Sequence, residues 1–391
     1  MTARVRGNSM RIVRRDSVDP LDCDSPLLGR LFASRGLVSI EELDHSLQGL
    51  LPPSALKGID RAAEIVCAAI EAEASILVVG DFDADGATSC ALLVSALRAM
   101  RVSSVNYLVP DRFRFGYGLS PEIVEVAAGL NPDLLITVDN GISSIEGVAL
   151  ANSLGIEVIV TDHHLPGSSL PGASAIVNPN QPGCEFPSKH LAGVGVAFYL
   201  LSVVRSELRA RNWFDGRNEP NLADWLDLVA LGTIADVVQL DQNNRRLVHE
   251  GLRRIRAGRA RPGLNALIET SGLDRTALHT RDLAFSVAPR LNAAGRLQDM
   301  TVGIECLLST GDRALELATH LDELNQERRE IEANMRDQAL QFLKELSLDD
   351  RKIAGLCVYR DNWHEGVVGI IASRIKERTF RPAVAFAPVV A

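Results

Sequence analysis

The sequence predicts an α/β protein built on a parallel sheet, and three observations support this. Four short apolar stretches are typical of buried strands, at 75–80, 102–109, 133–138 and 156–160. Helical patterns of about a dozen residues separate them. Three of the four stretches end in acidic or histidine residues. Ligands of open α/β sheets lie at the carboxyl ends of the strands, so we expect these residues to converge on one site.

Composition excludes several other classes of protein. The chain has 391 residues, 46% hydrophobic and 23% charged, which is too apolar and too mixed in charge for a disordered chain. Its 41 basic and 50 acidic residues give a net charge of −9, which argues against a protein that simply coats nucleic acid. No stretch reaches the roughly 20 apolar residues of a membrane span, and the basic start lacks a signal-peptide core. The six cysteines are scattered without a Cys-x-x-Cys pair, so we expect reduced thiols in a cytoplasmic protein.

The elements follow in order along the chain. Residues 1–55 contain turn formers and short amphipathic pieces, and Met10 is an alternative start to Met1. Helices are predicted around the strands, over 61–74, 87–100, from Ser120 onward, and from Ser143 or Ser144 to 154. Pro121 lies in the first turn of the third of these helices, where proline is favoured.

Beyond about residue 190 the pattern is mainly helical. The basic 245–261 segment holds seven arginines and is either the wall of a groove or, as we favour, a solvated helix face. Charges alternate along 315–346, which predicts a long helix that bridges two domains. On its surface, Glu332 and Arg336 have the spacing of an i,i+4 ion pair.

A second α/β unit follows that helix. A strand is predicted at 353–359 and a helix at 366–376, which is too little for a complete domain. The expected organisation is an N-terminal extension at 1–55, an α/β domain at 56–260, a helical connector at 261–348 and an incomplete second α/β domain at 349–391.

The first polar cluster is Asp81, Asp83 and Asp85, followed by Gly86. Three carboxylates at alternate positions repel one another unless a cation lies among them, and Mg²⁺ and Mn²⁺ prefer oxygen ligands. An EF-hand loop is disfavoured, because Leu92 stands where its twelfth-position Glu is required. A solvated turn remains the alternative.

Three further positions add to this cluster. Asp139 begins an Asp-Asn-Gly sequence that alone is ordinary turn chemistry. Asp162, His163 and His164 follow the next strand, and neutral imidazole binds Mn²⁺ or Zn²⁺; an Asp cap with two surface histidines is the alternative. Asp236 follows the apolar 222–234 segment and Ala235, and alone it is better explained as a turn.

Together these clusters contain six Asp and two His at the ends of predicted elements. That set suffices for two metal ions about 3.5–4 Å apart that share a bridging carboxylate. The chemistry that the residues alone indicate is metal-dependent hydrolysis of a phosphoester or phosphoanhydride.

At this point the sequence resembles a known family, the DHH phosphoesterase superfamily, which takes its name from a triplet like Asp162–His164. Within it, the order of motifs is most similar to that of the bacterial single-strand-specific DNA exonucleases. The matching segments are 80–89, 109–120, 137–143, 161–164, 191–198, 231–238, 289–297 and 363–374. The triplet alone is weak, whereas all segments in this order are highly specific.

The resemblance implies 5′→3′ degradation of single-stranded DNA to mononucleotides, with Mg²⁺ or Mn²⁺ at a two-metal site, in recombination and repair. It makes 56–260 the catalytic domain. The metal positions that it implies are Asp81, Asp83, Asp85, Asp139, His163 and Asp236. Among these, Asp139 is the candidate bridging ligand and, with Asp83, a candidate catalytic residue. His164 matches the position expected to touch the scissile phosphate.

The remaining motifs contain candidate substrate-binding residues, namely Arg112, Tyr117, Arg290, Asn292, Arg296, His364 and Arg374. Guanidinium groups bind phosphate oxygens bidentately, and aromatic rings stack on any base. The alternatives are surface charge for the arginines and core packing for Tyr117. Trp363, next to His364, is equally well explained as a residue of the hydrophobic core.

The resemblance also bears on the extent of the chain and on partners. Family members continue beyond a segment like 386–388 into a Gly-rich motif and an OB-fold, so we expect a C-terminally truncated relative. Two other readings follow: a hydrolase of short oligonucleotides or small phosphoesters, or an inactive fragment. Single-stranded DNA is the expected partner, with a single-strand-binding protein and a helicase as further candidates, in the bacterial cytoplasm.

Overall fold

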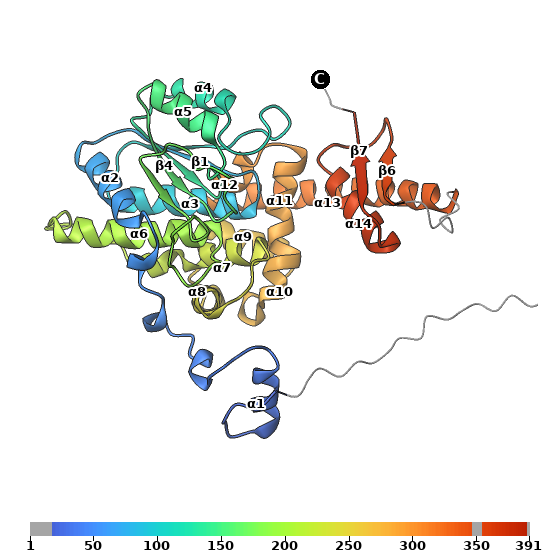
Figure 1. Ribbon diagram of the computed structural model, residues 1–391, viewed down its shortest axis with the longest axis horizontal. Coiled ribbons are helices and arrows are strands. Elements are labelled where there is room, and N and C mark those ends of the chain that lie inside the picture. Colours follow the sequence, from blue (N-terminus) through green and yellow to red (C-terminus); the bar gives the residue numbers. More distant parts are fainter. Residues whose placement is uncertain (1–17, 346–353, 389–391) are drawn as a thin grey trace, which may run out of the picture.

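The computed structural model describes residues 18–345 and 354–388. A five-stranded parallel sheet of order β2-β1-β3-β4-β5 forms its centre (Figure 1). The strands are β1 (Ile76–Gly80), β2 (Val105–Leu108), β3 (Leu134–Val138), β4 (Glu157–Thr161) and β5 (Ala175–Val177). The predicted α/β class with a parallel sheet is confirmed. The sequence does not predict β5, because three residues are too few to show a periodicity.

Helices cover both faces of the sheet, and alternate residues of each strand enter different cores. Ile76 and Val78 of β1 pack into the larger core, whereas Leu77 and Val79 pack into a smaller one. The smaller core is closed by α4 (Pro121–Ala128) and α5 (Ile145–Ser153), which lie together at the top of Figure 1. The larger core is closed by α2 (Ile59–Glu71), α3 (Ala84–Ala99), α6 (Gly193–Ala210) and α7 (Leu226–Ala235).

A helical layer extends the larger core away from the sheet. Its helices are α8 (Gln242–Arg256), α9 (Pro262–Thr270), α10 (Thr280–Asp282), α11 (Ala288–Leu297) and α12 (Thr301–Leu308). Shorter turns are η4 (Leu222–Trp225), η5 (Arg275–Ala277) and the π-helical η6 (Leu283–Val287). Before the sheet lie α1 (Pro26–Ala33), η1 (Ile40–Leu43), η2 (Leu47–Gly49) and η3 (Pro53–Ala55). Figure 1 shows α1 apart from the sheet.

Three of the arginines at 245–261 pair with carboxylates distant in sequence, whereas Arg253 and Arg259 are exposed to solvent. The guanidinium of Arg261 is bonded to the fully buried Asp227 at 2.8 Å, and Arg254 pairs with Asp224. Arg245 pairs with Glu42 at 3.0 Å. These arginines therefore hold the helical layer and the N-terminal segment together. The expectation of a solvated face was wrong for Arg245, Arg254 and Arg261, because their carboxylate partners are distant in sequence.

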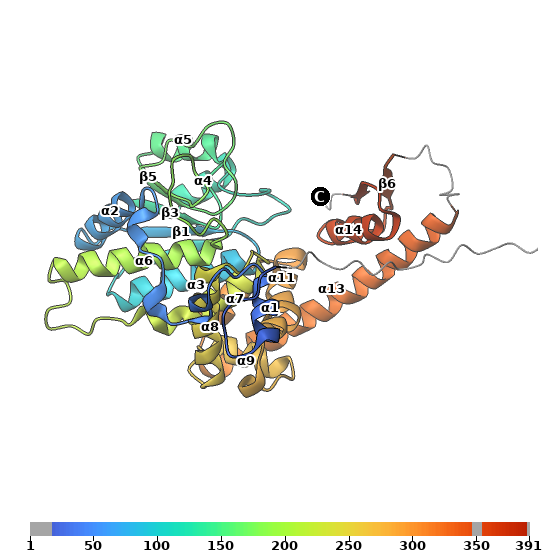
Figure 2. The ribbon, with the colours of Figure 1, turned by 60° about the horizontal axis from the view of Figure 1, so that its bottom comes forward.

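The long helix α13 (Gly311–Glu345) connects the main body to a second unit, as Figure 2 shows. That unit pairs β6 (Leu356–Tyr359) with β7 (Ala383–Phe386) in parallel and connects them through α14 (Val368–Thr379). Trp363 is buried in its core and donates to Gln338 Oε1 at 2.8 Å. Trp363 is thus a core residue.

The expected Glu332–Arg336 pair is absent from α13 in the described residues. Glu332 instead pairs with Arg328 at 2.7 Å and with Arg374 of α14 at 3.4 Å, while Arg336 pairs with Asp337 at 3.1 Å. Glu332 faces the second unit, which local spacing does not reveal. Within the described part of the chain, no helix is long and apolar enough to cross a membrane.

Candidate active site

The first acidic cluster lies where β1 turns into α3. Asp83 caps this helix, because its Oδ1 accepts from the backbone N–H groups of Asp85 at 2.9 Å and Gly86 at 3.0 Å. Asp85 is buried and accepts from the backbone N–H groups of Gly193 at 2.7 Å and Val194 at 3.0 Å, at the start of α6. The turn is tight, since a Cβ at Gly86 would lie 2.4 Å from the carbonyl oxygen of Asp81.

Asp139 follows β3 in a constrained conformation. Its φ of 61° is left-handed, a region that residues other than Gly, Asn and Asp rarely occupy. The buried Asn140 holds the turn by donating to the carbonyl oxygens of Val79 at 3.1 Å and Val138 at 2.9 Å. The Asp139 carboxylate is thereby buried at the carboxyl edge of the sheet.

His163 connects Asp139 to Asp236, which ends α7. His163 Nε2 lies 3.1 Å from Asp139 Oδ1 and 3.4 Å from Asp236 Oδ2. Neither approach has hydrogen-bond geometry, so the buried Nε2 and Oδ1 atoms both lack a hydrogen-bond partner among the described residues. Buried polar atoms without partners are costly, and they are typical of sites that complete their bonding with a ligand.

His164 is oriented by its neighbour Asp162. The buried Asp162 Oδ1 lies 2.7 Å from His164 Nδ1, and Asp162 Oδ2 accepts from the backbone N–H of Ile142 at 2.9 Å. The hydrogen bond to Asp162 raises the pKa of His164 to about 9, so its imidazole is cationic at neutral pH. On its outer side the hydroxyl of Tyr117 lies 3.3 Å from Nδ1, with the two rings edge to face.

The clusters expected to converge do so, in three overlapping groups of potential ligand atoms. These groups are Asp81, Asp83 and Asp139; Asp85, His163 and Asp236; and Asp139, His163 and His164, with the ligand atoms of each group within 4.8 Å of one another. Burial, aided by mutual repulsion with Asp83 or Asp85, raises the pKa of Asp81, Asp85 and Asp236 to about 7 each. The pKa of Asp139 is raised for the same reasons, and burial lowers that of His163.

Two glycines allow helices to approach these carboxylates closely. A Cβ at Gly193 would lie 2.6 Å from Asp139 Oδ1, and one at Gly232 would lie 2.7 Å from Asp85 Oδ1. We expect Gly193→Ala to lower the free energy of unfolding by about 1–3 kcal/mol through overpacking. Urea denaturation measures this. Gly172→Ala is the matched control, since nothing lies within 4 Å of its added Cβ, and equal stability of the two variants would contradict the account.

The residues predicted in the 289–297 motif have different partners. Asn292 Oδ1 accepts from the backbone N–H of Ala84 at 2.8 Å, so its carbonyl holds the β1–α3 turn. Arg290 is buried and paired with Asp322 of α13 at 2.7 Å, which assigns it to packing and not to the site. Arg296 donates to the carbonyl oxygen of Gly366 at 3.2 Å, between the main body and the second unit.

The other predicted substrate-binding residues border the same region. The Arg112 guanidinium lies 4.4 Å from the centroid of the Phe82 ring, within the first acidic turn. His364 lies edge to face against Phe113, with centroids 6.1 Å apart. Arg374 is half exposed and paired with Glu332 and Glu377, so the structure does not bring it to the carboxylates.

Sequence reasoning missed the residues that position the two histidines. Asp162 belongs to the third polar cluster of the sequence, but its role in orienting His164 was not predicted. Asn180 donates to the carbonyl oxygen of His163 at 2.6 Å, and Asn178 to that of His164 at 3.0 Å. The only sequence signal for Asn178 and Asn180 was the turn-forming Asn-Pro-Asn sequence that contains them, directly after β5.

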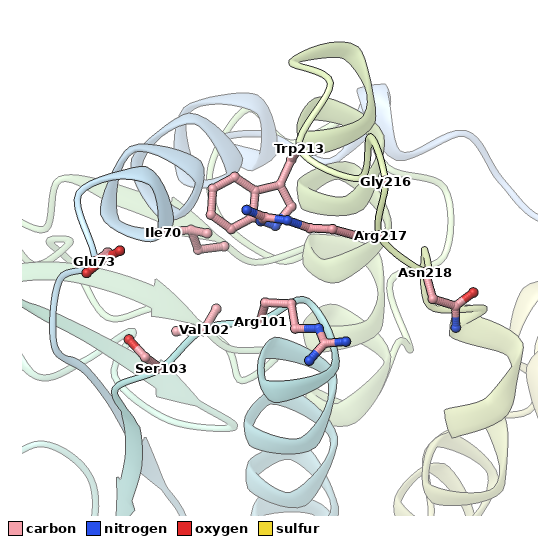
Figure 3. Close-up of a pocket in the computed structure, with 9 residues that line it drawn as sticks. All are labelled: Ile70, Glu73, Arg101, Val102, Ser103, Trp213, Gly216, Arg217 and Asn218. Atoms are coloured by element: carbon pink, nitrogen blue, oxygen red, sulfur yellow. The ribbon is translucent and has the colours of Figure 1, made fainter.

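A separate cavity of about 510 Å³ lies at the amino ends of β1 and β2 (Figure 3). Trp213, with Arg217 stacked 4.5 Å from its ring centroid, forms one wall, and Ile70, Val102 and Arg101 form others. Because the carboxylates lie at the opposite edge of the sheet, this cavity is not part of the candidate active site.

Comparison with known proteins agrees with this geometry. The model of the DHH family, N-terminal domain, matches residues 75–233, so fold and site define this part of the main body as a DHH domain. The single-stranded-DNA-specific exonuclease RecJ of Salmonella typhimurium is 57% identical over 367 residues, which are 93% of this chain and 64% of that protein. That of Bacillus subtilis is 38% identical, over 92% of this chain and 44% of its own length.

Solved structures extend this similarity. The crystal structure of exonuclease RecJ bound to manganese is 36% identical, with a TM-score of 0.75, over 87% of this chain and 81% of that one. RecJ of Thermus thermophilus in complex with Mg²⁺ is 32% identical, with a TM-score of 0.67, over 93% of this chain and 48% of that one. The chain belongs to the RecJ family. It spans less than two thirds of the length of the curated relatives named above.

Proposed function

We propose that this chain hydrolyses phosphodiester bonds of single-stranded DNA from the 5′ end with two divalent cations. The observation that carries the proposal is the pair of buried atoms without hydrogen-bond partners, Asp139 Oδ1 and His163 Nε2. Both belong to more than one potential ligand group, so a cation beside them would complete their bonding. Relatives with solved structures are described as RecJ bound to manganese or in complex with Mg²⁺, which suits the oxygen-rich ligand set here.

Six residues divide between the two ions in this proposal. Asp81, Asp83 and Asp139 would hold one ion, and Asp85, His163 and Asp236 the other. Asp139 lies in the group with Asp83 and also in a group with His163, so it is the candidate bridging carboxylate that would contact both ions. A bound pair of such ions supplies positive charge that stabilises both the attacking and the leaving oxygen of an in-line displacement.

The chain's own residues orient the substrate. The cationic His164, held by Asp162, donates a hydrogen bond to an oxygen of the scissile phosphate. Tyr117, beside it and half exposed, offers a ring to a base of the strand. Arg112 and Arg296 offer guanidinium groups to neighbouring phosphates, and Asn292 positions the acidic turn through Ala84.

The relatives' names support single-stranded DNA as the substrate. Release of mononucleotides and the 5′→3′ direction follow from the family resemblance, as do a role in recombination and repair and an association with a single-strand-binding protein and a helicase. A role in recombination and repair would place the reaction in the bacterial cytoplasm.

The test is an assay with 5′-labelled single-stranded DNA and Mn²⁺. We expect labelled mononucleotide from the first time points, and no product with excess chelator or with His163→Ala. The control is Asp215→Asn, which removes an exposed carboxylate far from the site and should retain full activity. A folded protein that cleaves dinucleotides but no longer strand would instead support a small-substrate hydrolase. A folded protein that cleaves neither would contradict the proposal.

A further inference from the structure

An apolar surface lies directly beside the candidate metal site. Val237 follows Asp236 and is 84% exposed, and Phe285 of η6 is 71% exposed. The two line a cavity of about 380 Å³ with Ile234, Val238 and Ala284. Large apolar side chains this exposed, gathered around one cavity, are typical of an interaction site. We call this the Val237–Phe285 surface.

Backbone conformation exposes Val237. Its φ is 60°, in the left-handed region that β-branched residues almost never adopt. Asp236, one residue earlier, has an ordinary helical conformation and lies 3.4 Å from His163 Nε2. The helical path of the chain therefore ends between the candidate ligand and the exposed valine. Such strain persists where the surrounding structure enforces it, and it is concentrated at functional sites.

A second irregularity exposes Phe285. It lies in the middle of a π-helical turn whose end residues, Leu283 and Val287, are both buried. Single π-turns are rare and occur mostly at functional sites. This turn packs against α7, the helix that ends at Asp236. Two independent backbone irregularities thus present apolar side chains to the same cavity.

The chemistry of the cavity fits a nucleotide. Val237 and Phe285 offer one aliphatic and one aromatic surface, and Arg281 also lines the cavity. Arg281 is exposed and forms no ion pair within the described part of the chain, so its charge is available to a phosphate. Consecutive Cα atoms are about 3.8 Å apart, so Val237 lies within one nucleotide's length of the Asp236 backbone.

We propose that the Val237–Phe285 surface packs against a base of the bound strand, next to the nucleotide whose phosphate lies at the metal site. This inference rests on the proposed function. It adds a base-binding site on the Asp236 side of the phosphate that lies at the metal site. Apolar packing offers no hydrogen-bond readout, so the contact accepts every base.

Equilibrium binding tests this separately from hydrolysis. Ca²⁺ replaces Mn²⁺, and fluorescence anisotropy follows a 3′-labelled strand of about ten nucleotides, with normal or abasic residues at its 5′ end. We expect the parent protein to bind the abasic strand at least about 10-fold more weakly, the order of one lost stacking contact. Phe285→Ala should bind the normal strand about 10-fold more weakly and should distinguish the two strands less than the parent does, because Tyr117 still offers its ring to a base.

Two further variants complete the design. Leu154→Ala, which truncates an exposed apolar residue at the far end of α5, should bind like the parent. Val237→Gly relieves the left-handed strain, so it should keep or raise Tm and still weaken binding of the normal strand. Val237→Gly therefore still tests the proposal if Phe285→Ala fails to fold. Parent-like affinity of Val237→Gly and Phe285→Ala for both strands would overturn the proposal, whereas failure of the hydrolysis assay alone would overturn only the proposed function.

Discussion

Replacing Asp139 with Asn is expected to lower kcat/KM for Mn²⁺-dependent hydrolysis by on the order of 10³-fold while the fold stays intact. Asp139 belongs both to the group with Asp81 and Asp83 and to a group with His163, so its charge would serve both proposed ions. Asn removes that charge at nearly constant shape. It also tolerates the left-handed φ of 61°, so no backbone strain is added.

Two measurements check this result. Steady-state kinetics on single-stranded DNA gives kcat/KM, and thermal unfolding without metal shows whether the fold persists. The metal-free Tm of Asp139→Asn should not fall below that of the parent, because burial already disfavours the charged form of Asp139 and raises its pKa. Retention of more than about a tenth of the parent's kcat/KM would contradict a bridging role.

The second large effect is that of pH on the stability of the metal-free protein. Asp81, Asp85 and Asp236 have pKa values raised to about 7, above the ordinary value of 3.8. Between these values the folded protein holds protons that the unfolded chain has lost, so stability falls as pH rises through that window. We expect the metal-free Tm to decrease from about pH 5 to pH 8. Mn²⁺ should raise Tm more at pH 8, because protons compete with the metal at lower pH.

Other groups titrate in the same pH range, so a variant is needed to measure how much the carboxylates contribute to the pH dependence of Tm. Asp236→Asn removes one group with a raised pKa, and its metal-free Tm should decrease less between pH 5 and pH 8 than that of the parent. Differential scanning fluorimetry with and without chelator measures both curves. Parallel curves for parent and variant, together with a Mn²⁺ effect that does not depend on pH, would contradict the account.

Part of the site could be read from the sequence because parallel strands impose a common geometry. Asp81, Asp139 and His163 each follow an apolar strand, and the carboxyl ends of such strands meet at one edge. The alternating charges along 315–346 also predicted the long helix α13. Local patterns were therefore sufficient wherever a residue's position follows from the element that precedes it.

The other features of the site could not be predicted, because they depend on contacts between residues that are distant in sequence. Arg290 and Asn292 stand two positions apart, yet one packs on Asp322 while the other holds Ala84. Nothing in the motif distinguishes them, because the helix that receives Arg290 is formed some thirty residues later along the chain. The Val237–Phe285 surface was invisible for a related reason, since a left-handed valine and a π-turn have no sequence pattern.

The central claim is that one chain holds two divalent cations among six residues. Equilibrium dialysis against Mn²⁺ at pH 8, followed by elemental analysis, measures this directly. We predict two Mn²⁺ ions per chain for the parent and one for Asp236→Asn, which disrupts only the group with Asp85 and His163. Two ions in both proteins, or fewer than two in the folded parent, would contradict the account.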